Sequence, residues 1–469
     1  MEIMKQRLIT SVIALSLLTI APAWGQTSVI RREKQQTQST KTPKKEFSVG
    51  AYKYVTLDGA SVSISAKEWG KVPDKELVIP SSIEYQGKKY TVKKIDCFQY
   101  CKIESVKIPS SVTEIGESAF AHCASLSAFT VPSQIRTIGV CAFEGCKNLQ
   151  EIKVDPSNQF FTSVDGVLYD KQKTKLLASP GGKTNCNILS GVKTIGFAAF
   201  RDSKLQSVIV PRSVNTIESC AFWGCKQMKS IDIPTSVTTI SDYVFAFSGI
   251  EKIVIPSSIN TIPKHAFSSC KNLKEISIPQ SINRIEDEAL RDCCIKILNI
   301  PASVQYISED TGTLNIDSLQ AINVETGNTK YSSVDGVLYN KSKSVLLRVP
   351  KLKQGEFIIP PSVKDIAKGA FYYCKDISSV IVPQGVTTIG EWAFCNTGIA
   401  EMNVPSTIKS ISRYSFWGCS KLNKLSLPSS ILGSLKKGTF NYGCYGLKVI
   451  TVRYPNGQTK ELNADKWKE

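Results

Sequence analysis

Fifteen cysteines are the first candidates for chemistry in this chain of 469 residues. Many of them stand three residues after a recurring phenylalanine, and other copies of the same pattern carry serine or threonine there. Serine cannot replace a disulfide partner, but it can replace a small buried residue that bonds to turn backbone. We therefore expect a column of free, buried thiols. Its members are Cys101, Cys123, Cys146, Cys225, Cys270, Cys293, Cys374 and Cys419, with Ser203, Ser248 and Thr397 in copies that lack cysteine.

The other cysteines follow no common position, and an occasional disulfide among them stays open. They are Cys97, Cys141, Cys186, Cys220, Cys294, Cys395 and Cys444. The spacing of paired C-x-x-C motifs that is typical of structural zinc sites does not occur. We therefore expect no metal site.

The remaining candidates for catalysis are sparse. The chain has only two histidines, His122 and His265, and neither stands beside a distinctive Ser or Cys motif. The acidic run Glu286-Asp287-Glu288 is interpreted as a solvated patch in a turn. A phosphate-binding loop, an H-E-x-x-H motif and a dinucleotide fingerprint are all missing from the sequence. We expect neither an enzyme nor a cofactor.

A repeat of 22 or 23 residues must position all of these side chains. It reads roughly Leu-x-x-Ile-x-Ile-Pro-x-x-Val-x-x-Ile-Gly-x-x-Ala-Phe-x-x-Cys, and its prolines recur from Pro211 to Pro234 to Pro256. Self-similarity at this period indicates a leucine-rich-repeat solenoid. We expect a β-rich, curved solenoid with parallel strands on the concave face and an irregular, short extended convex wall.

Within one copy, Ile276 and Ile278 point inward because strand residues alternate, and Pro279 ends the strand. The chain then crosses the core and returns through the Ala-Phe turn. The recurring phenylalanines should stack as a spine through the core. They are Phe98, Phe120, Phe143, Phe200, Phe222, Phe245, Phe267, Phe371, Phe394, Phe416 and Phe440, with Leu290 standing in once.

Two copies contain the same insertion, near residues 158–180 and 328–350. Each carries Val-Asp-Gly-Val-Leu-Tyr, and the Asp-Gly pairs predict β-hairpins standing on the edge of the solenoid. These hairpins could contact a partner or only brace the stack. Residues 303–318 lack the regular pattern, so we expect an irregular coil there.

The organisation expected from these patterns has five parts. A signal peptide, with its positive start, apolar run and Ala-Trp-Gly cleavage site, covers residues 1–25. A disordered basic linker follows over 26–48, capping β-structure over 49–99, the solenoid over 100–448, and a C-terminal cap and tail over 449–469. We expect an exported protein that is extracellular, on the cell surface or periplasmic, with no transmembrane segment after cleavage.

The outward strand positions between the two inward residues form the expected ligand-contact face. They mix polar side chains with exposed isoleucine and valine, as protein contact patches do. They are Lys107, Thr130, Lys153, Ile209, Asp232, Val254, Ser277, Asn299, Ile381, Asn403 and Ser426. The net charge of +18 would favour an acidic glycan as a partner, whereas aromatic and basic residues do not interleave as a nucleic-acid groove requires.

The chain resembles the BspA-like leucine-rich-repeat family, also called the Treponema pallidum type. The resemblance rests on the recurring motif I-P-S-S-V-x-x-I-G-x-x-A-F-x-x-C and on the V-D-G-V-L-Y insertions. The resemblance covers residues 77–452. It implies a secreted or surface-exposed protein of a host-associated bacterium, from a family with members that adhere to host or bacterial surface components. We expect protein binding or adhesion through the concave face, and as the alternative a carbohydrate-binding or spacer protein of the cell envelope.

Overall fold

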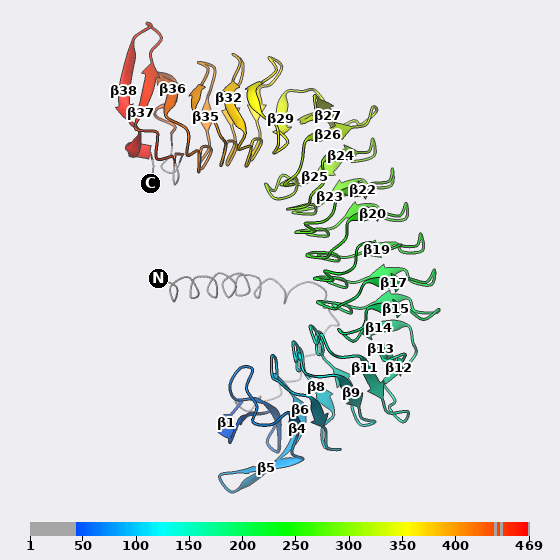
Figure 1. Ribbon diagram of the computed structural model, residues 1–469. Coiled ribbons are helices and arrows are strands. Elements are labelled where there is room, and N and C mark those ends of the chain that lie inside the picture. The colour runs from blue at the N-terminus through cyan, green and yellow to red at the C-terminus, as the bar shows by residue number, and fades with distance from the viewer. Residues whose placement is uncertain (1–43, 436–438, 441–443, 468–469) are drawn as a thin grey trace, which may run out of the picture. The chain divides into compact units, whose positions relative to one another are not determined.

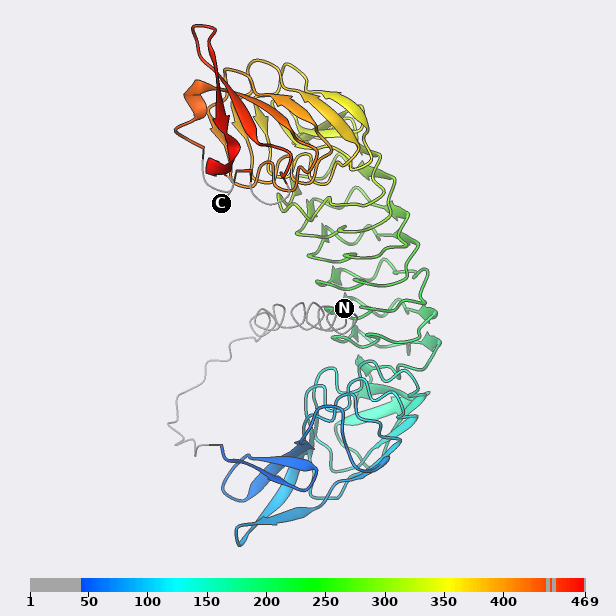
Figure 2. The same ribbon diagram turned by 60° about the vertical axis from the view of Figure 1, so that its left-hand side comes forward.

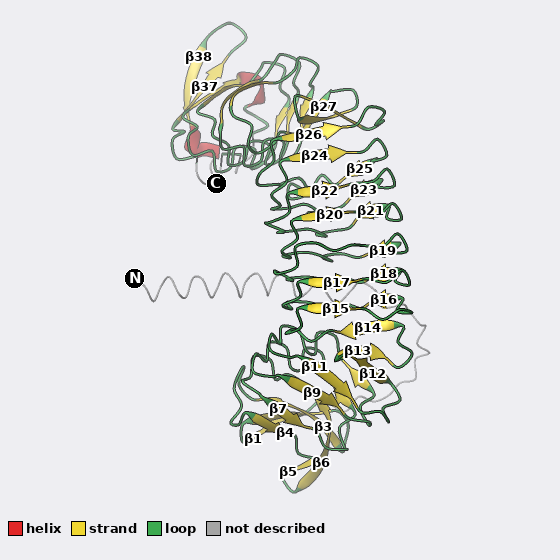
Figure 3. Cartoon of the chain, turned by 45° about the vertical axis from the view of Figure 1, so that its right-hand side comes forward, coloured by secondary structure: helices red, strands yellow, loops and turns green. Residues whose placement is uncertain are grey.

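The computed structural model describes residues 44–435, 439–440 and 444–467. These residues form a β-solenoid of about 15 coils that stack one on the next (Figure 1). Almost every element is a short strand, and the helical segments near the C-terminal end are single 3-10 turns, η2 (Ser429–Ile431) and η3 (Ala464–Trp467) (Figure 3). The expected signal peptide and most of the expected linker lie outside the described residues. The predicted β-rich leucine-rich-repeat solenoid is confirmed.

The first wall of the solenoid consists of strands that in most coils precede a recurring proline, and neighbouring strands pair in parallel. Because the side chains of a strand alternate between its two faces, every second residue points into the core, and Ile253 and Ile255 are each only 2% exposed. The strands are β4 (Glu76–Val78), β7 (Ser105–Lys107), β9 (Ala128–Val131), β11 (Glu151–Val154), β15 (Asn185–Asn187), β17 (Ser207–Ile209), β20 (Lys252–Val254), β22 (Glu275–Ser277), β24 (Ile297–Ile300), β26 (Ala321–Val324), β30 (Gly355–Ile358), β32 (Ile377–Ile381), β34 (Glu401–Asn403), β36 (Lys424–Pro428) and β37 (Val449–Arg453).

The second wall consists of two-residue strands, mostly Thr-Ile, whose isoleucine points into the core. These strands also pair in parallel from coil to coil, as Thr216 does with Thr194 and Thr239. They are β8 (Glu114–Ile115), β10 (Thr137–Ile138), β16 (Thr194–Ile195), β18 (Thr216–Ile217), β19 (Thr239–Ile240), β21 (Thr261–Ile262), β23 (Arg284–Ile285), β25 (Tyr306–Ile307), β31 (Asp365–Ile366), β33 (Thr388–Ile389) and β35 (Ser410–Ile411).

The third wall is the Ala-Phe turn, which contains no regular strand but is hydrogen-bonded along the stack. The Phe120 N–H donates to the Ala142 carbonyl of the next coil at 2.9 Å. Residues two before and two after the phenylalanine take left-handed backbone, as Ser118 (φ 53°) and His122 (φ 58°) do. Glycine, asparagine or aspartate, which tolerate positive φ best, fills only about a third of these positions, as Gly145, Asp202 and Asn396 do.

The phenylalanine column forms three separate stacks rather than one continuous spine. Within each stack the ring centroids are 4.8–6.2 Å apart. The breaks fall at the two insertions, where the inserted coil carries Ser179-Pro180 or Val349-Pro350 in place of an Ala-Phe turn, and Leu290 ends the middle stack. The core divides at the same places into three hydrophobic clusters.

The cysteine column is a ladder of free thiols, as predicted. All fifteen cysteines lie among the described residues and none forms a disulfide. The Cys225 Sγ–H donates to the Phe200 carbonyl of the preceding coil at 3.0 Å, and Ser203 lies 3.5 Å from the same sulfur. Cys444 belongs to this ladder too, because its Sγ–H donates to Phe416 at 2.8 Å. The sequence hid it because one extra residue separates it from Phe440.

Each insertion folds as an antiparallel hairpin but does not stand free of the solenoid. The hairpins are β12 (Phe161–Val164) with β13 (Val167–Asp170), and β27 (Tyr331–Val334) with β28 (Val337–Asn340). A third strand, β14 (Lys175–Ala178) or β29 (Val345–Arg348), joins each hairpin to the parallel ladder of the second wall. The hairpins pack into the core, because the valine, leucine and tyrosine of β13 and β28 are buried.

β-Hairpins cover both ends of the described coils (Figure 2). At the N-terminal end, β1 (Glu46–Val49), β2 (Tyr52–Thr56), β3 (Ser61–Ala66), β5 (Ser82–Tyr85) and β6 (Lys88–Ile95) form one sheet, which continues into the second wall at β8. At the other end, β38 (Thr459–Asn463) folds back on β37 across the Asn456-Gly457 turn. Such caps shield the core that the last coil would otherwise expose.

Candidate binding face

The outer side of the first wall carries the predicted contact residues. Strand alternation turns Val254 outward, where it is 58% exposed, between two buried isoleucines. All eleven predicted residues lie on this outer side, and all are exposed except Ser426, which is half-buried. They form a single register column, since Val254 pairs with Ser277 and Asn403 with Ser426.

The same column has members that the sequence pattern did not single out. Each of them pairs in register with a residue of the predicted set: they are Val78, Asn187, Asn323, Ile358 and Thr451. Asn187 and Asn323 were hidden because their strands lack the marker proline. Val78 and Ile358 do stand two residues before a proline. They were not singled out because Val78 lies in the range expected as the N-terminal cap and Ile358 lies just after the second insertion.

The largest apolar feature of this face joins two adjacent strands. Ile358 on β30 and Ile381 on β32 are direct neighbours in register and are 62% and 46% exposed. Ile209 and Val254 are isolated in the same column, because polar neighbours flank them. Single exposed apolar residues are ordinary on protein surfaces, whereas adjacent ones form a patch that water solvates poorly.

Charged side chains surround the apolar positions on the outer side of the first wall. Lys107 pairs with Glu76 at 3.1 Å, and Lys252 and Lys424 pair with glutamates of neighbouring strands at 3.8 Å. These pairs are exposed, so each contributes well under about 1 kcal/mol and is screened by salt. A face of this kind has an apolar centre with a polar rim, as protein interfaces do.

The third wall carries a second surface, made of aromatic and polar side chains. Trp417 and Tyr445 line an open groove of about 660 Å³ together with Lys375, Asp376 and Asn396. Elsewhere on this wall, Tyr100 stacks between Trp69 and His122. Ring faces beside amide and carboxylate groups can bind a sugar by stacking and hydrogen bonding.

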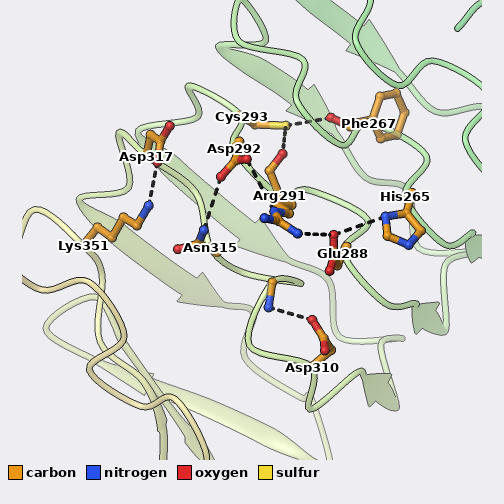
Figure 4. Close-up of polar contacts among 11 residues, drawn as sticks. His265, Phe267, Glu288, Arg291, Asp292, Cys293, Asp310, Asn315, Asp317 and Lys351 are labelled. Carbon is orange, nitrogen blue, oxygen red and sulfur yellow. Dashed lines mark hydrogen bonds and ion pairs between the residues drawn. The ribbon is translucent and has the colours of Figure 1, made fainter. Parts of the chain in front are cut away.

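The two histidines belong to networks of polar contacts that join neighbouring coils, and Figure 4 shows the network of His265. The His265 ring lies 3.3 Å from the Glu288 carboxylate, which also accepts a bond from Arg291 at 2.7 Å. The His265 hydrogen bond and then Arg291 hold the pKa of Glu288 at about 2, against the desolvation that would raise it. Asp287 also forms an ion pair, with Lys264 at 2.9 Å. The interpretation of residues 286–288 as a solvated acidic patch is therefore wrong, since these carboxylates pair with neighbouring side chains.

His122 lies in a similar network. His122, Glu144 and Asp202 bring potential metal-ligating atoms within 4.8 Å of one another, and no other such group occurs among the described residues. The Arg201 guanidinium already pairs with the Glu144 carboxylate at 2.9 Å. We therefore assign these side chains to pairing between coils and not to a metal centre. Within the described ranges, no helix reaches the length and apolarity that crossing a bilayer requires.

Comparison with known proteins places this geometry in a family. The profile of the BspA type leucine rich repeat region matches six copies, over residues 62–173, 193–311 and 351–461. A leucine rich cell surface protein from Faecalibacterium prausnitzii A2-165 shares 20% identity over 89% of this chain and 96% of its own, with a TM-score of 0.45. The pneumococcal vaccine antigen PcpA shares 20% identity over 87% and 88%, with a TM-score of 0.42.

The leucine rich repeat protein of T. pallidum is also similar, at 21% identity over 50% of this chain and 82% of its own, with a TM-score of 0.22. No curated protein matches. The three family matches leave out the parts of the chain that contain the breaks between phenylalanine stacks, and together they cover well over half of the sequence. This chain belongs to the BspA-type leucine-rich-repeat family.

Proposed function

We propose that the protein binds a protein partner through the outer side of its first wall, at the patch formed by Ile358 and Ile381. The observation that carries this proposal is the exposure of these two isoleucines side by side in register. Burying such a pair against a partner is favourable by about 25 cal/mol per Å² of apolar surface. Proteins of this family are cell-surface proteins and are typically non-enzymatic binding proteins.

We further propose that the chain is exported and that its partner is a host extracellular protein or a bacterial surface component, so that binding amounts to adhesion. The apolar run and small-residue cleavage site at the start of the sequence support export. The test immobilises the full chain and measures its binding to a panel of purified host extracellular proteins and acidic glycans at 50 and 500 mM salt. Fractionation of expressing cells tests export separately.

A protein partner held at the apolar patch should stay bound in high salt, because apolar contacts are not screened. Replacement of Ile381 by glutamate should then weaken binding. If raising the salt concentration from 50 to 500 mM abolishes binding, and the Ile381→Glu substitution leaves binding unchanged, the proposal is contradicted.

The groove on the third wall favours a second candidate function, carbohydrate binding. The side chains of Trp417 and Tyr445 provide two ring faces, and Asp376 and Asn396 provide polar groups beside them. Replacement of Trp417 by alanine should abolish glycan binding and leave protein binding unchanged. Glycan binding that survives this substitution would exclude the groove.

A further inference from the structure

A second open groove on the third wall adjoins the groove of Trp417 and Tyr445. Its volume is about 550 Å³, and its lining extends from Arg291 to Lys375 and Asp376. The groove of Trp417 is lined by the same two residues, Lys375 and Asp376, at its near end. The two openings therefore join, and we call them together the long groove.

The long groove runs along the stack and not around one coil. Its lining comes from seven successive coils, from the coil of Arg291 to the coil of Tyr445. At about 4.8 Å per coil, the spacing that paired strands keep in the other two walls, the groove is roughly 30 Å long. An elongated ligand fits this shape better than a compact one does.

The backbone along the groove is already hydrogen-bonded from coil to coil. The Tyr373 N–H donates to the Cys395 carbonyl at 2.9 Å, and the Asn396 N–H donates to the Trp417 carbonyl at 2.7 Å. An extended peptide binds by pairing with free backbone groups of a strand edge, and these groups are in use. The groove instead offers side chains, which are the groups that sugar hydroxyls contact.

Charged side chains at the far end of the long groove already pair with neighbours (Figure 4). The Lys351 ammonium lies 2.6 Å from Oδ1 of Asp317, and Asn315 donates to Asp292 at 3.2 Å. Such pairing leaves little net charge on this part of the wall, so it attracts neither a polyanion nor a polycation strongly.

The groups that stay free in the groove are of both signs. Lys375, Lys421 and Asp376 are exposed, and within the described ranges their side chains form no ion pair. The Lys375 ammonium lies over the Tyr373 ring, 5.4 Å from its centroid, which holds it beside the groove. These accessible donors and acceptors suit an uncharged ligand that is rich in hydroxyls.

The near end of the groove provides ring faces. Trp392 lies in an edge-to-face arrangement with Trp417, at 5.7 Å between centroids, and so fixes the position of that ring. Tyr445 beside it is 73% exposed. Sugar rings pack on such faces through their apolar C–H groups.

We propose that the long groove binds a linear, uncharged glycan strand that lies along the stack. Sugar rings would pack on Trp417 and Tyr445, and hydroxyls further along the strand would hydrogen-bond to side chains from Asp376 to Asp317. Each unit of a β-1,4-linked chain advances by close to one coil, so successive units meet successive coils. This inference rests on the carbohydrate binding proposed above for the groove of Trp417 and extends it to a chain of several units.

The rings at the opposite end of the third wall are covered by their neighbours. Tyr100 has Trp69 on one side and His122 on the other, with centroids 5.4 and 4.6 Å away. The Arg201 guanidinium lies over the Trp223 ring at 4.3 Å. Trp69 is 67% exposed, so it provides a matched tryptophan outside the groove.

Isothermal titration calorimetry of the full chain tests the proposal, with β-1,4-linked oligomers of glucose and of N-acetylglucosamine, one to six units long, as probes. In at least one series the affinity should rise with each added unit, by roughly a hundredfold from monomer to hexamer, because each unit adds hydrogen bonds. The affinity should be the same at 50 and 500 mM salt, since the ligand carries no charge to be screened.

Substitutions at the two ends of the groove test how the strand lies. Trp417→Ala should weaken binding of both dimer and hexamer roughly tenfold, because a ring face is lost. The double variant Asp317→Ala/Leu352→Ala alters exposed residues at the far end, so it should melt close to the wild-type temperature. It should weaken hexamer binding roughly tenfold and leave dimer binding unchanged, since the dimer does not reach that far. The control Trp69→Ala should bind as the wild type does.

The outcomes separate this inference from carbohydrate binding itself. Equal affinity at every chain length, or a hexamer that is insensitive to the far-end variant, overturns the extended strand while carbohydrate binding at Trp417 stands. Binding of acidic glycans alone, lost in Trp417→Ala, likewise overturns the uncharged strand only. Equal losses in Trp69→Ala and Trp417→Ala overturn it as well. If no glycan of any charge binds, or if glycan binding survives Trp417→Ala, the carbohydrate function fails and this inference fails with it.

Discussion

The substitution Phe245→Ala tests how the core holds the coils together. Phe245 is fully buried and its ring lies 5.5 Å from those of both Phe222 and Phe267. Truncating a buried phenylalanine to alanine costs roughly 3–5 kcal/mol, which includes the lost ring contacts and the cavity left behind. Each coil contacts only its neighbours, so the loss should concentrate in the coils on either side.

Hydrogen exchange followed by mass spectrometry is the suitable assay, since a long repeat array need not unfold in one step. A loss of about 4 kcal/mol corresponds to roughly a thousandfold faster exchange through local opening. Peptides from residues 239–270 should show it, and peptides from the C-terminal stack should not. Phe245→Leu should cost much less, about 1 kcal/mol, because leucine conserves most of the volume and Leu290 already stands in this column.

The matched control is Phe247→Ala, two residues away in the same turn. Phe247 is 45% exposed, and Trp223 is the one aromatic ring that it contacts within the described ranges. Its loss should accelerate exchange by tenfold at most. If Phe247→Ala and Phe245→Ala accelerate exchange equally, or if Phe245→Leu is as damaging as alanine, the stacked rings do not carry the stability assigned to them.

Three further predictions concern the third wall. The pKa of Glu288 is depressed from 4.5 to about 2 by His265, so its stabilisation is complete above pH 4.5 and is lost as the pH falls toward 2. Glu288→Gln should therefore cost about 1 kcal/mol of stability at pH 7, allowing for solvent screening, and should make the melting temperature less dependent on pH between pH 4.5 and 2. If the variant loses stability in acid as steeply as the wild type does, the pairing of Glu288 is refuted. Gly224→Ala should destabilise the chain by more than about 1 kcal/mol in thermal melts, because φ of Gly224 is +69° and the new Cβ would lie 2.4 Å from Oδ1 of Asp202. The control Gly191→Ala changes an exposed glycine whose new Cβ would meet no atom, so it measures the backbone effect alone. Burial raises the pKa of Cys225 to about 12, so its thiol should resist alkylation at pH 8 until denaturant is added, and a disulfide at Cys225 in the native chain would contradict the ladder.

The walls of the solenoid could be predicted from the sequence because packing dictates their residues. Inward isoleucines, strand-ending prolines and the Ser-for-Cys exchange all report contacts that every coil repeats. Where the period changes, this reasoning fails. Cys444 was missed because of one added residue. The hairpins were expected on the edge of the solenoid, and their pairing with the second wall was not foreseen because it has no local sequence signal.

The candidate site could be predicted only as a column, not as a patch. Alternation identified Ile381 as outward, but Ile358 was missed although it also stands two residues before a proline, because its strand follows the second insertion directly. Charge pairing was equally hidden, since His265 and Glu288 meet only when coils stack. The cavity beside the second insertion lies where successive coils lack the column phenylalanine, and no local pattern predicts a cavity there.

We propose that the isoleucine patch on the first wall, formed by Ile358 and Ile381, binds the partner. The most direct test measures the affinity of the double variant Ile358→Glu/Ile381→Glu for the partner found by the binding panel. The control variant is Val140→Glu, which alters an exposed apolar residue next to the second wall. Loss of two central apolar contacts at about 1.5 kcal/mol each predicts affinity reduced roughly a hundredfold. Val140→Glu should bind as the wild type does. Wild-type affinity in the double variant, or an equal loss of affinity in Val140→Glu, would show that the partner binds elsewhere.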